Sequence, residues 1–419
     1  MSWSRRKFIA GSLAAGVAGC AYRPARSSEP KKVVIIATVV RKYAHAQHFV
    51  DRLLEGYGWQ GRHHYPAVKL AGMYVDQFPD DDLARERSRR HGVPIFPSVE
   101  EALTLGGSKL AVDGVLIIGE HGKYPRNEKG QTLYPRYKWF KQVVKVFEDS
   151  GRAVPIFNDK HLSTDWRECA EMVADSKRLK FPFMAGSSLP VTWRIPSSEV
   201  RRGNALRESV SVCYGGIDSY DFHGYETAQC MSERRVGGES GVKSMQAFRG
   251  ERLWKRVEEG ENTPKLLLAA LARSHTGRGR EGYTYSIPDM AWIKETNPSA
   301  VGFFVEHVDG FRTTMLMLNG FIDDFTYAGL VGDRVVSCQM YLPMPPRYTT
   351  LADFFSPLMN HVEHMVLTGD APYPVERTLL TSGMTLSGVE SLHRDQTKVE
   401  TPEMRVAYQA PRESAYWRK

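Results

Sequence analysis

The sequence has few cysteines and no long apolar run, and both absences exclude classes of protein. No hydrophobic stretch reaches the roughly 20 residues that a membrane-spanning helix needs, so we expect no such span. None of the 5 cysteines stands at C-x-x-C spacing, which excludes the metal sites built on that spacing. In an oxidising compartment the last four could form disulfides or remain buried thiols: Cys169, Cys213, Cys230 and Cys338.

A basic surface suited to nucleic acid is also missing. The formal net charge is +8, but the first 32 residues hold seven basic residues and one acid. The remainder therefore carries only about +2, and no basic module interleaved with aromatic residues stands out. We do not expect a nucleic-acid partner.

Residues 1–31 are predicted to be an export signal and tether. Paired arginines, Arg5 and Arg6, precede a short apolar stretch at 9–19, as in a twin-arginine signal. The residues before Cys20 resemble a bacterial lipobox, which predicts a lipoprotein acylated at Cys20 in the periplasm or on the extracytoplasmic membrane face. Cleavage without lipidation is the alternative. Membrane contact is expected only through the lipid anchor.

The chain after the tether divides into two patterns. From 32 to 195, buried strands alternate with amphipathic helices, which predicts an α/β, Rossmann-like parallel sheet. From 196 to 419, successive strands with flanking helices predict an α+β domain with an open, mainly antiparallel sheet. Expected strands are 33–36, 68–75, 92–96, 112–118, 153–157, 181–185, 210–214, 244–248, 300–307, 313–318, 325–330 and 335–342; expected helices include 81–91, 98–105, 135–150, 164–179, 219–235 and 351–367.

The stretch at 33–48, VVIIATVVRKYAHAQH, is typical of the first strand, turn and helix of a nucleotide-binding domain. Its turn contains no glycine. A dinucleotide fingerprint uses three glycines, for the tight turn, the approach of the pyrophosphate, and the contact of helix with strand. The turn therefore raises the question whether a cofactor binds here.

The order of segments resembles the Gfo/Idh/MocA family of sugar-active, nicotinamide-dependent oxidoreductases over roughly residues 32–400. The resemblance rests on the following series: 33–46 with His45-Ala46, GVPIFPSVEEAL at 92–103, 112–118, Asp159-Lys160, 215–226, and a helix ending in Thr368-Gly369. It implies hydride transfer between a sugar or glycoside hydroxyl and NAD or NADP. It also implies a homo-oligomer paired through the open sheet.

The resemblance places a degenerate fingerprint after the first strand, with Ala37, Val39 and Lys42 where the glycines belong. The branched Cβ of Val39 would stand where the pyrophosphate approaches the backbone. An acid ending the second strand would hold the ribose, although a helix cap is an equal alternative. The cofactor-binding residues implied are Thr38, Val39, Lys42, Asp76, Glu120 and Lys160.

The resemblance also implies catalytic residues. Lys160 matches the family lysine that contacts cofactor and substrate, and His223 matches the histidine that accepts the hydroxyl proton. A carboxylate should orient that histidine, and Asp218 or Asp221 stands nearby. The alternatives are that Lys160 is a surface lysine in a turn, and that His223 only makes hydrogen bonds within its own helix.

Aromatic and polar residues at strand ends are the candidates for substrate contact, namely His121, Tyr124, His161 and Trp193; core or loop packing is the alternative for the aromatic ones. A second interpretation is a divalent metal held by His121, Asp159, His161, His223 or Glu226. Such a site would make the protein a non-redox lyase or hydrolase. A third is a catalytically silent carbohydrate-binding protein. His361, Glu363 and His364 are expected on an exposed helix face.

Overall fold

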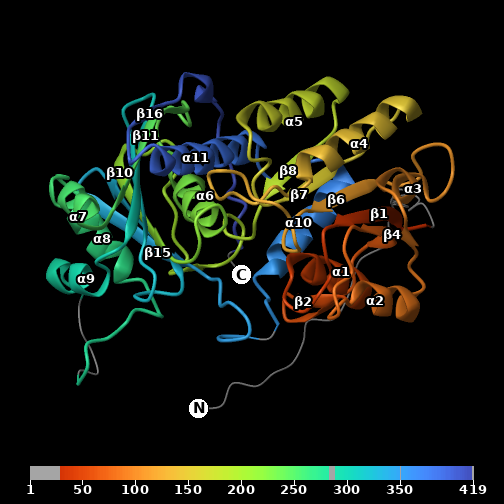
Figure 1. Cartoon of the computed structure of the whole chain (residues 1–419), viewed down its shortest axis with the longest axis horizontal. Coiled ribbons are helices and arrows are strands. Elements are labelled where there is room, and N and C mark those ends of the chain that lie inside the picture. The colour runs from red at the N-terminus through yellow and green to blue at the C-terminus, as the bar shows by residue number, and fades with distance from the viewer. Residues whose placement is uncertain (1–28, 283–287, 350, 418–419) are drawn as a thin grey trace, which may run out of the picture. The chain divides into compact units, whose positions relative to one another are not determined.

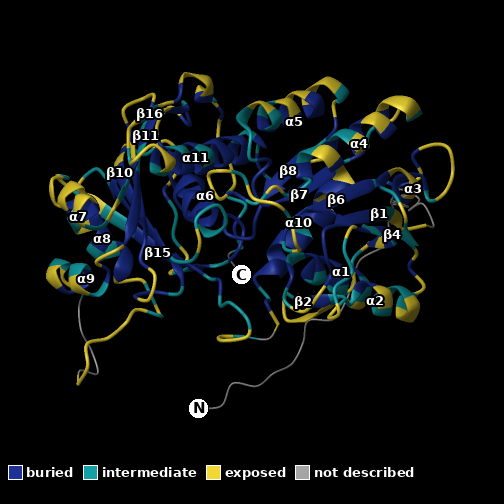
Figure 2. Ribbon diagram, in the orientation of Figure 1, coloured by how far each residue is buried: buried dark blue, intermediate teal, exposed yellow. Residues whose placement is uncertain are grey.

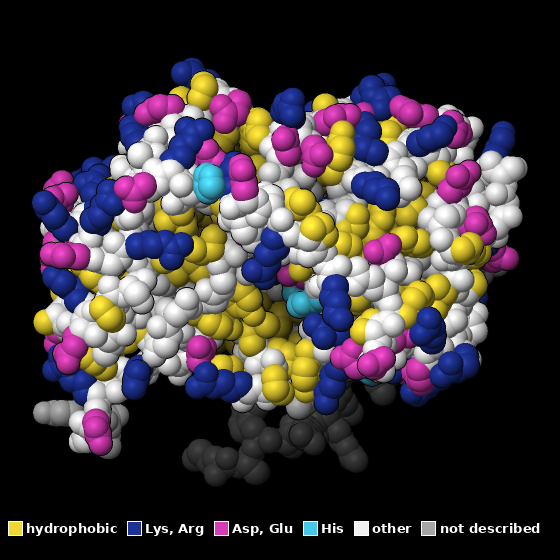
Figure 3. Space-filling model, in the orientation of Figure 1, with side chains coloured by type: hydrophobic (Ala, Val, Ile, Leu, Met, Phe, Trp, Pro, Cys, Tyr) yellow, Lys and Arg dark blue, Asp and Glu magenta, His cyan; other side chains and the backbone are white. Residues whose placement is uncertain are grey.

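The computed structural model describes residues 29–282, 288–349 and 351–417 (Figure 1). The predicted export signal and the lipobox at Cys20 lie outside these residues. Residues 31–419 form one compact unit. Among the described helices, none is both long and apolar enough to cross a membrane. On the face seen in Figure 3, basic and acidic side chains are interspersed rather than gathered by sign.

The first sheet is parallel, as predicted, with the strand order β5-β4-β1-β6-β7-β8 in the described residues. The side chains of β1 alternate between two cores: Val33 and Ile35 face one core, while Val34 and Ile36 face the other. Helix α1 lies on one face and α4 and α5 lie on the other (Figure 1). The bounds are β1 Lys31–Ala37, β4 Val68–Val75, β5 Ile95–Phe96, β6 Gly114–Ile118, β7 Ile156–Asp159, β8 Phe183–Gly186, α1 His45–Glu55, α2 Ala84–His91, α3 Val99–Thr104, α4 Arg136–Ser150 and α5 Trp166–Leu179.

The second sheet has the order β16-β11-β12-β13-β10-β14-β15-β9 in the described residues. Strands β10 and β13 pair in parallel and the other neighbours pair antiparallel, which confirms the predicted α+β class. The bounds are β9 Arg194–Ile195, β10 Leu206–Cys213, β11 Val242–Arg249, β12 Val301–His307, β13 Arg312–Met317, β14 Phe325–Val331, β15 Arg334–Met340, β16 Val399–Glu400, α6 Tyr220–Ser232, α7 Gly250–Glu258, α8 Thr263–Leu271, α9 Met290–Thr296 and α11 Glu376–His393.

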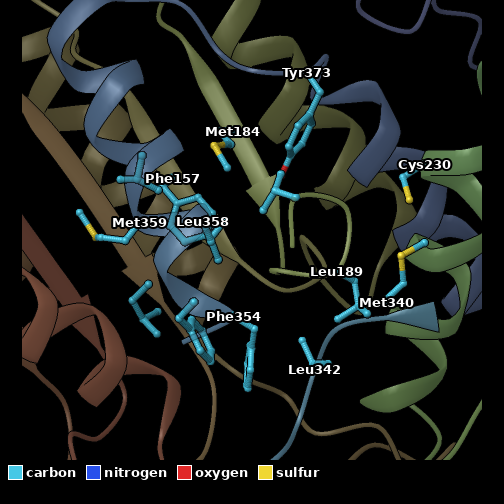
Figure 4. Close-up of a cluster of buried hydrophobic side chains, with 14 of the residues drawn as sticks. Phe157, Met184, Leu189, Cys230, Met340, Leu342, Phe354, Leu358, Met359 and Tyr373 are labelled. Atoms are coloured by element: carbon cyan, nitrogen blue, oxygen red, sulfur yellow. The ribbon is translucent and has the colours of Figure 1, made fainter. Parts of the chain in front are cut away.

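Two helices lie between β15 and β16 along the chain, and one of them, α11, contacts elements on both sides. Helix α11 packs against α5, α6 and β11, and α6 and α11 are buried along most of their length (Figure 2). Helix α10 (Phe355–Thr368) packs on α1 and β4. Figure 4 shows Leu358 and Met359 of α10 beside Phe157 and Met184 of the first sheet. One hydrophobic core therefore runs through both sheets.

Several local predictions were wrong. A hairpin of β2 (Tyr57–Trp59) and β3 (Arg62–His64) is present where no strand was predicted. Glu363, expected on an exposed face, is buried because it accepts hydrogen bonds from Ala67 N–H and the Tyr57 hydroxyl. Helices α7, α8 and α9 were not predicted, because their short apolar patterns lie between stronger strand signals.

Candidate functional site

A small cavity lies where three neighbouring parallel strands end. Glu120 and His121 follow β6, Lys160 follows β7, and Ser187 follows β8. The carboxyl ends of parallel strands meet at one edge of a sheet, which is where α/β proteins bind ligands. The cavity volume is about 80 Å³. Its wall also includes His45, His48, Tyr220, His223 and Phe355.

Three buried side chains form a hydrogen-bonded chain that opens into this cavity. Nζ of Lys160 lies 2.6 Å from Nε2 of His223, and Nδ1 of His223 lies 3.1 Å from Oε2 of Glu226. The backbone N–H of Ser187 donates to Oε1 of Glu226 at 2.8 Å, and the Ser187 hydroxyl donates to Oε2. Glu226 therefore orients the imidazole and leaves Nε2 facing Lys160.

The backbone holds Lys160 in an unusual conformation. Its φ is 69°, in the left-handed region that non-glycine residues rarely adopt. Its N–H donates to the carbonyl of Gly186 at 3.0 Å, which anchors the residue to the end of β8. Backbone strain of this kind, held by neighbouring bonds, is concentrated at functional sites. The turn thus directs the ammonium group into the cavity.

Burial sets the protonation states of this chain. Burial, reinforced by the Lys160 charge, holds the pKa of His223 well below its usual value, so the imidazole is neutral near pH 7. Burial raises the pKa of Glu226 to about 7, although the Ser187 hydrogen bonds oppose the rise. A neutral imidazole with a hydrogen-bonded carboxyl partner can accept a proton.

The opposite wall of the cavity carries further titratable groups. Burial opposes ionisation of Glu120, but the Lys160 charge, 3.8 Å away, and nearby histidines hold its pKa at about 2. Burial lowers the pKa of His121 to about 4. Nδ1 of His45 lies 2.7 Å from Oδ2 of Asp159. The wall therefore combines the Glu120 carboxylate with the neutral ring of His121 and with the His45 ring.

Some predicted site residues lie outside this cavity. The Asp218 carboxylate accepts from the side chain of Gln131 and the N–H of Thr132, both at 3.0 Å, so it does not reach His223. The ring of His161 is buried against the guanidinium of Arg136. Asp218 and His161 are therefore hydrogen-bonded to other parts of the protein and do not face the cavity.

Three other predicted residues lie elsewhere. The carboxylate of Asp159 contacts His45. The Tyr124 hydroxyl donates to Asp76 at 2.7 Å. Trp193 lines a separate groove.

The sequence analysis missed three contributions to the cavity. Glu226, considered only as a metal ligand, is the carboxylate that orients His223, and its spacing three residues further along α6 was the available signal. The ring of Tyr220 lies 5.9 Å from that of His223, and the Lys160 Nζ lies 5.7 Å from the Tyr220 ring centroid. His45 was noted only as part of a family signature.

The turn after β1 does not form a phosphate cradle. Helix α1 begins only at His45, whereas a dinucleotide fingerprint opens its helix within the glycine-rich turn. The intervening segment runs along 82–83: Leu83 N–H donates to the Val40 carbonyl at 2.8 Å, and Arg41 forms a β-bridge with Asp82. Val39 is buried. The N-terminus of α1 therefore lies beyond this turn, whereas a fingerprint places it within the turn.

The ribose position is also engaged by the chain itself. Both carboxylate oxygens of Asp76 accept tyrosine hydroxyls, from Tyr74 at 2.8 Å and Tyr124 at 2.7 Å. The amide of Gln77 exchanges two hydrogen bonds with the backbone of Lys123, at 2.9 and 3.0 Å. The loop after β6 is thus fastened to the end of β4. The turn after β1 and Asp76 therefore do not fit a nicotinamide dinucleotide bound in the manner of a glycine-rich fingerprint.

The histidines and acids do not form a metal centre here. Among the described residues, no group of three or more His, Cys, Asp or Glu side chains is placed to hold an ion. In particular, Asp159 and His161 contact His45 and Arg136 instead.

Comparisons with known proteins reveal a similar fold in several dehydrogenases. Neither protein-family models nor curated protein sequences match this chain. GenD2 from gentamicin A biosynthesis, in complex with NAD, is similar with a TM-score of 0.55 and 11% identity, covering 93% of this chain and 99% of GenD2. Apo scyllo-inositol dehydrogenase from Lactobacillus casei has a TM-score of 0.52 and 11% identity, covering 89% and 98%.

A myo-inositol dehydrogenase from Corynebacterium glutamicum is similar to the same degree, with a TM-score of 0.52 and 11% identity. The alignment covers 88% of this chain and 98% of that enzyme. The similarity extends over both sheets, and it supports the expected two-part architecture. At 11% identity, this similarity establishes the fold alone, and the chemistry has to be inferred from the residues of the site.

Proposed function

We propose that this chain is a divergent, exported relative of the Gfo/Idh/MocA oxidoreductases that acts on a sugar or glycoside by proton transfer. The observation that carries the proposal is the buried chain Lys160–His223–Glu226 at the edge of the cavity. Such a neutral histidine, oriented by a carboxyl group and adjacent to an ammonium, is suited to general-base chemistry.

The non-redox route, a lyase reaction, agrees best with the turn after β1. His223 Nε2 takes a proton from a carbon beside a sugar carbonyl, and Lys160 swings aside to donate to the developing oxyanion. The C–O bond at the next carbon then breaks as the C=C bond forms. The imidazolium, stabilised by Glu226, returns its proton to the departing oxygen. No oxidant is consumed in this sequence.

Hydride transfer from a sugar hydroxyl carbon to a nicotinamide is the second candidate. The dehydrogenases that share the fold favour it, one of them in complex with NAD. A surface cavity of about 380 Å³ at the end of β1 is flanked by Arg41 and Lys123, which could hold an anion. In this reaction His223 accepts the hydroxyl proton and Lys160 positions the hydroxyl.

Nucleotide analysis separates the two routes. The purified protein is denatured and the supernatant is assayed for nicotinamide and, on the same sample, for metal. We expect no stoichiometric nucleotide, and no binding of added NAD or NADP by calorimetry. A stoichiometric nicotinamide would instead establish the redox route, and a stoichiometric metal would favour a metal-dependent hydrolase or lyase.

Substitution tests the catalytic assignments. Lys160→Met and His223→Ala should each abolish turnover of whichever substrate is found among glycosides, oxidised glycosides and free sugars. Tyr65→Phe, at an exposed ring outside the cavity, is the matched control and should retain full activity. Full activity in either active-site variant would remove that residue from the mechanism.

The location of the protein is part of the proposal. The sequence Ser4–Phe8 and the residues before Cys20 support twin-arginine export and lipid anchoring at the extracytoplasmic membrane face. In cells fed radiolabelled palmitate, the wild type should become labelled and Cys20→Ser should not. Labelling of the variant would contradict the anchor.

A further inference from the structure

A groove that is much larger than the catalytic cavity lies beside it and has no role in the chemistry described above. Its volume is about 1150 Å³, against about 80 Å³ for the cavity. It is bounded by the hairpin β2–β3, by α1 as far as its last residue, by the segment after β8, by the start of α10 with the residues before it, and by Trp417 near the C-terminus. Tyr43 and His48 line both spaces, so the groove adjoins the cavity.

Three tryptophans from distant parts of the chain line the groove: Trp59, Trp193 and Trp417. The ring centroids of Trp59 and Trp417 lie 4.1 Å apart with planes inclined at 41°, and the ring of Trp193 meets that of Tyr341 edge-on at 5.6 Å. All three tryptophans are half-buried, and Trp59 also packs against the hydrophobic core. They therefore offer partly exposed apolar surface from three directions.

Hydrogen-bonding groups lie among these rings. Helix α1 contributes Gln47, Asp51 and Glu55, and the hairpin contributes Gln60. Asp353 lines the groove too, and its Oδ1 is buried without a hydrogen-bond partner. A buried acceptor without a partner is costly, and a donor from a ligand would satisfy it.

We propose that this groove binds a chain of sugar units, so that the substrate is an oligosaccharide or a glycoside whose reacting unit enters the cavity. Sugar rings present apolar C–H faces, which pack on aromatic rings, and hydroxyl edges, which need hydrogen-bond partners. The groove supplies both kinds of contact, and its basic side chains are balanced by acids, unlike a phosphate site. This inference deepens the proposed function and rests on it for the site of reaction.

The binding test uses four soluble probes, cellopentaose, maltopentaose, xylopentaose and mannopentaose, with glucose as the single-unit comparison. Binding to the purified protein is measured by calorimetry and by tryptophan fluorescence. At least one pentasaccharide should bind more tightly than glucose and should change the fluorescence. Failure of all four to bind to the folded protein would overturn the proposal.

Variants then locate the binding site. Trp59→Ala and Trp417→Ala should each weaken the affinity for that pentasaccharide by about tenfold or more, whereas Trp59→Phe should retain most of it. Tyr65→Ala removes an aromatic ring that is 72% exposed just beyond the hairpin, and it should change nothing. Equal affinity in the wild type and both tryptophan variants would overturn the proposal. Circular dichroism confirms that each variant is folded.

The experiment also separates this inference from the proposed function. Lys160→Met should still bind the pentasaccharide, because Lys160 lies in the cavity and not in the groove. Binding without any turnover by the wild type would refute the enzymatic function and leave the groove assignment standing. Turnover of a short glycoside without pentasaccharide binding would refute the groove alone.

Discussion

At the scale of single residues, the end of strand β8 fixes Lys160 and Glu226, and these two side chains in turn hold His223 between them. Lys160 is held by the Gly186 carbonyl, and Glu226 is held by Ser187 at the end of the same strand, β8. His223 stands between them on α6. The orientation of the His223 ring is therefore set by Glu226 before substrate arrives, and only Lys160 has to move for Nε2 to accept a proton.

The pH profile should report on Glu226. Burial raises its pKa to about 7, so the carboxyl group is protonated and neutral below that value and negatively charged above it. Only the charged form stabilises the imidazolium of His223, and kcat/KM should therefore rise with pH through about 7. Glu226→Gln should abolish this limb and lower kcat/KM by about 100-fold.

Asp221 is the matched control for that profile. Burial also raises its pKa to about 7, but its carboxylate accepts from the N–H of Phe222 rather than from His223. Asp221→Asn should therefore keep the limb. If the limb persists in Glu226→Gln and disappears in Asp221→Asn, then Asp221 is the group that titrates, and the assignment to Glu226 is wrong.

At the scale of elements, the turn after β1 cannot hold a pyrophosphate as a fingerprint does, because α1 begins only at His45. Glycine at the three fingerprint positions would relieve the steric problem of Val39 but would not move the helix N-terminus, which is set by the pairing of Arg41 with Asp82 and of Val40 with Leu83. The backbone conformation of this segment, and not its side chains, therefore prevents dinucleotide binding.

The variant Ala37→Gly/Val39→Gly/Lys42→Gly should consequently show no gain of NAD binding at millimolar NAD. Calorimetry and the shift of the melting temperature with added NAD measure this, with the wild type as the control. A saturable gain in the variant would mean that side chains alone had closed the site.

Helices α6 and α11 are joined by a buried ion pair. The guanidinium of Arg377 donates to the carboxylate of Glu233 at 2.8 and 2.5 Å, and the Tyr408 hydroxyl also donates to that carboxylate at 2.8 Å. Arg377→Met would leave a buried charge without its partner. The free energy of unfolding should fall by about 3–5 kcal/mol in urea titration.

Two comparisons test the origin of that loss. Glu233→Gln/Arg377→Met should recover part of it, since no charge is then buried alone. Lys145→Met breaks a pair with Asp149 whose side chains are 73% and 60% exposed, and it should leave the free energy of unfolding essentially unchanged because solvent screens that pair. Equal losses in Arg377→Met and Lys145→Met would contradict the role of burial.

At the scale of the whole molecule, the four cysteines of the described residues are free and buried, in both parts of the fold. Burial raises the pKa of Cys169 to about 12 and that of Cys338 to about 11. The four cysteines are thus buried thiols and do not form disulfides. Their reaction with a thiol reagent should require unfolding.

Thiol titration with an aromatic disulfide reagent checks this in a Cys20→Ser variant, without reductant. The native protein should react negligibly, and all four thiols should react together in denaturant. Prompt labelling of any one in the native protein, or fewer than four after denaturation, would contradict the structure.

The sequence alone determined the architecture and the positions of the two main catalytic candidates. Alternating apolar runs report burial on both faces of a parallel sheet, and that information is local. Lys160 follows β7 of the first sheet and His223 lies on α6 beside the second sheet, and the structure brings their side chains together.

Only the tertiary structure decided which carboxyl group orients His223, how the turn after β1 runs, and that Trp59, Trp193 and Trp417 line one groove. The sequence suggested Asp218 or Asp221, which precede His223, but the carboxyl group that contacts its ring is that of Glu226, three residues further along α6. The physical reason is that periodicity records the environment of each residue, whereas contact between distant segments depends on how whole elements pack.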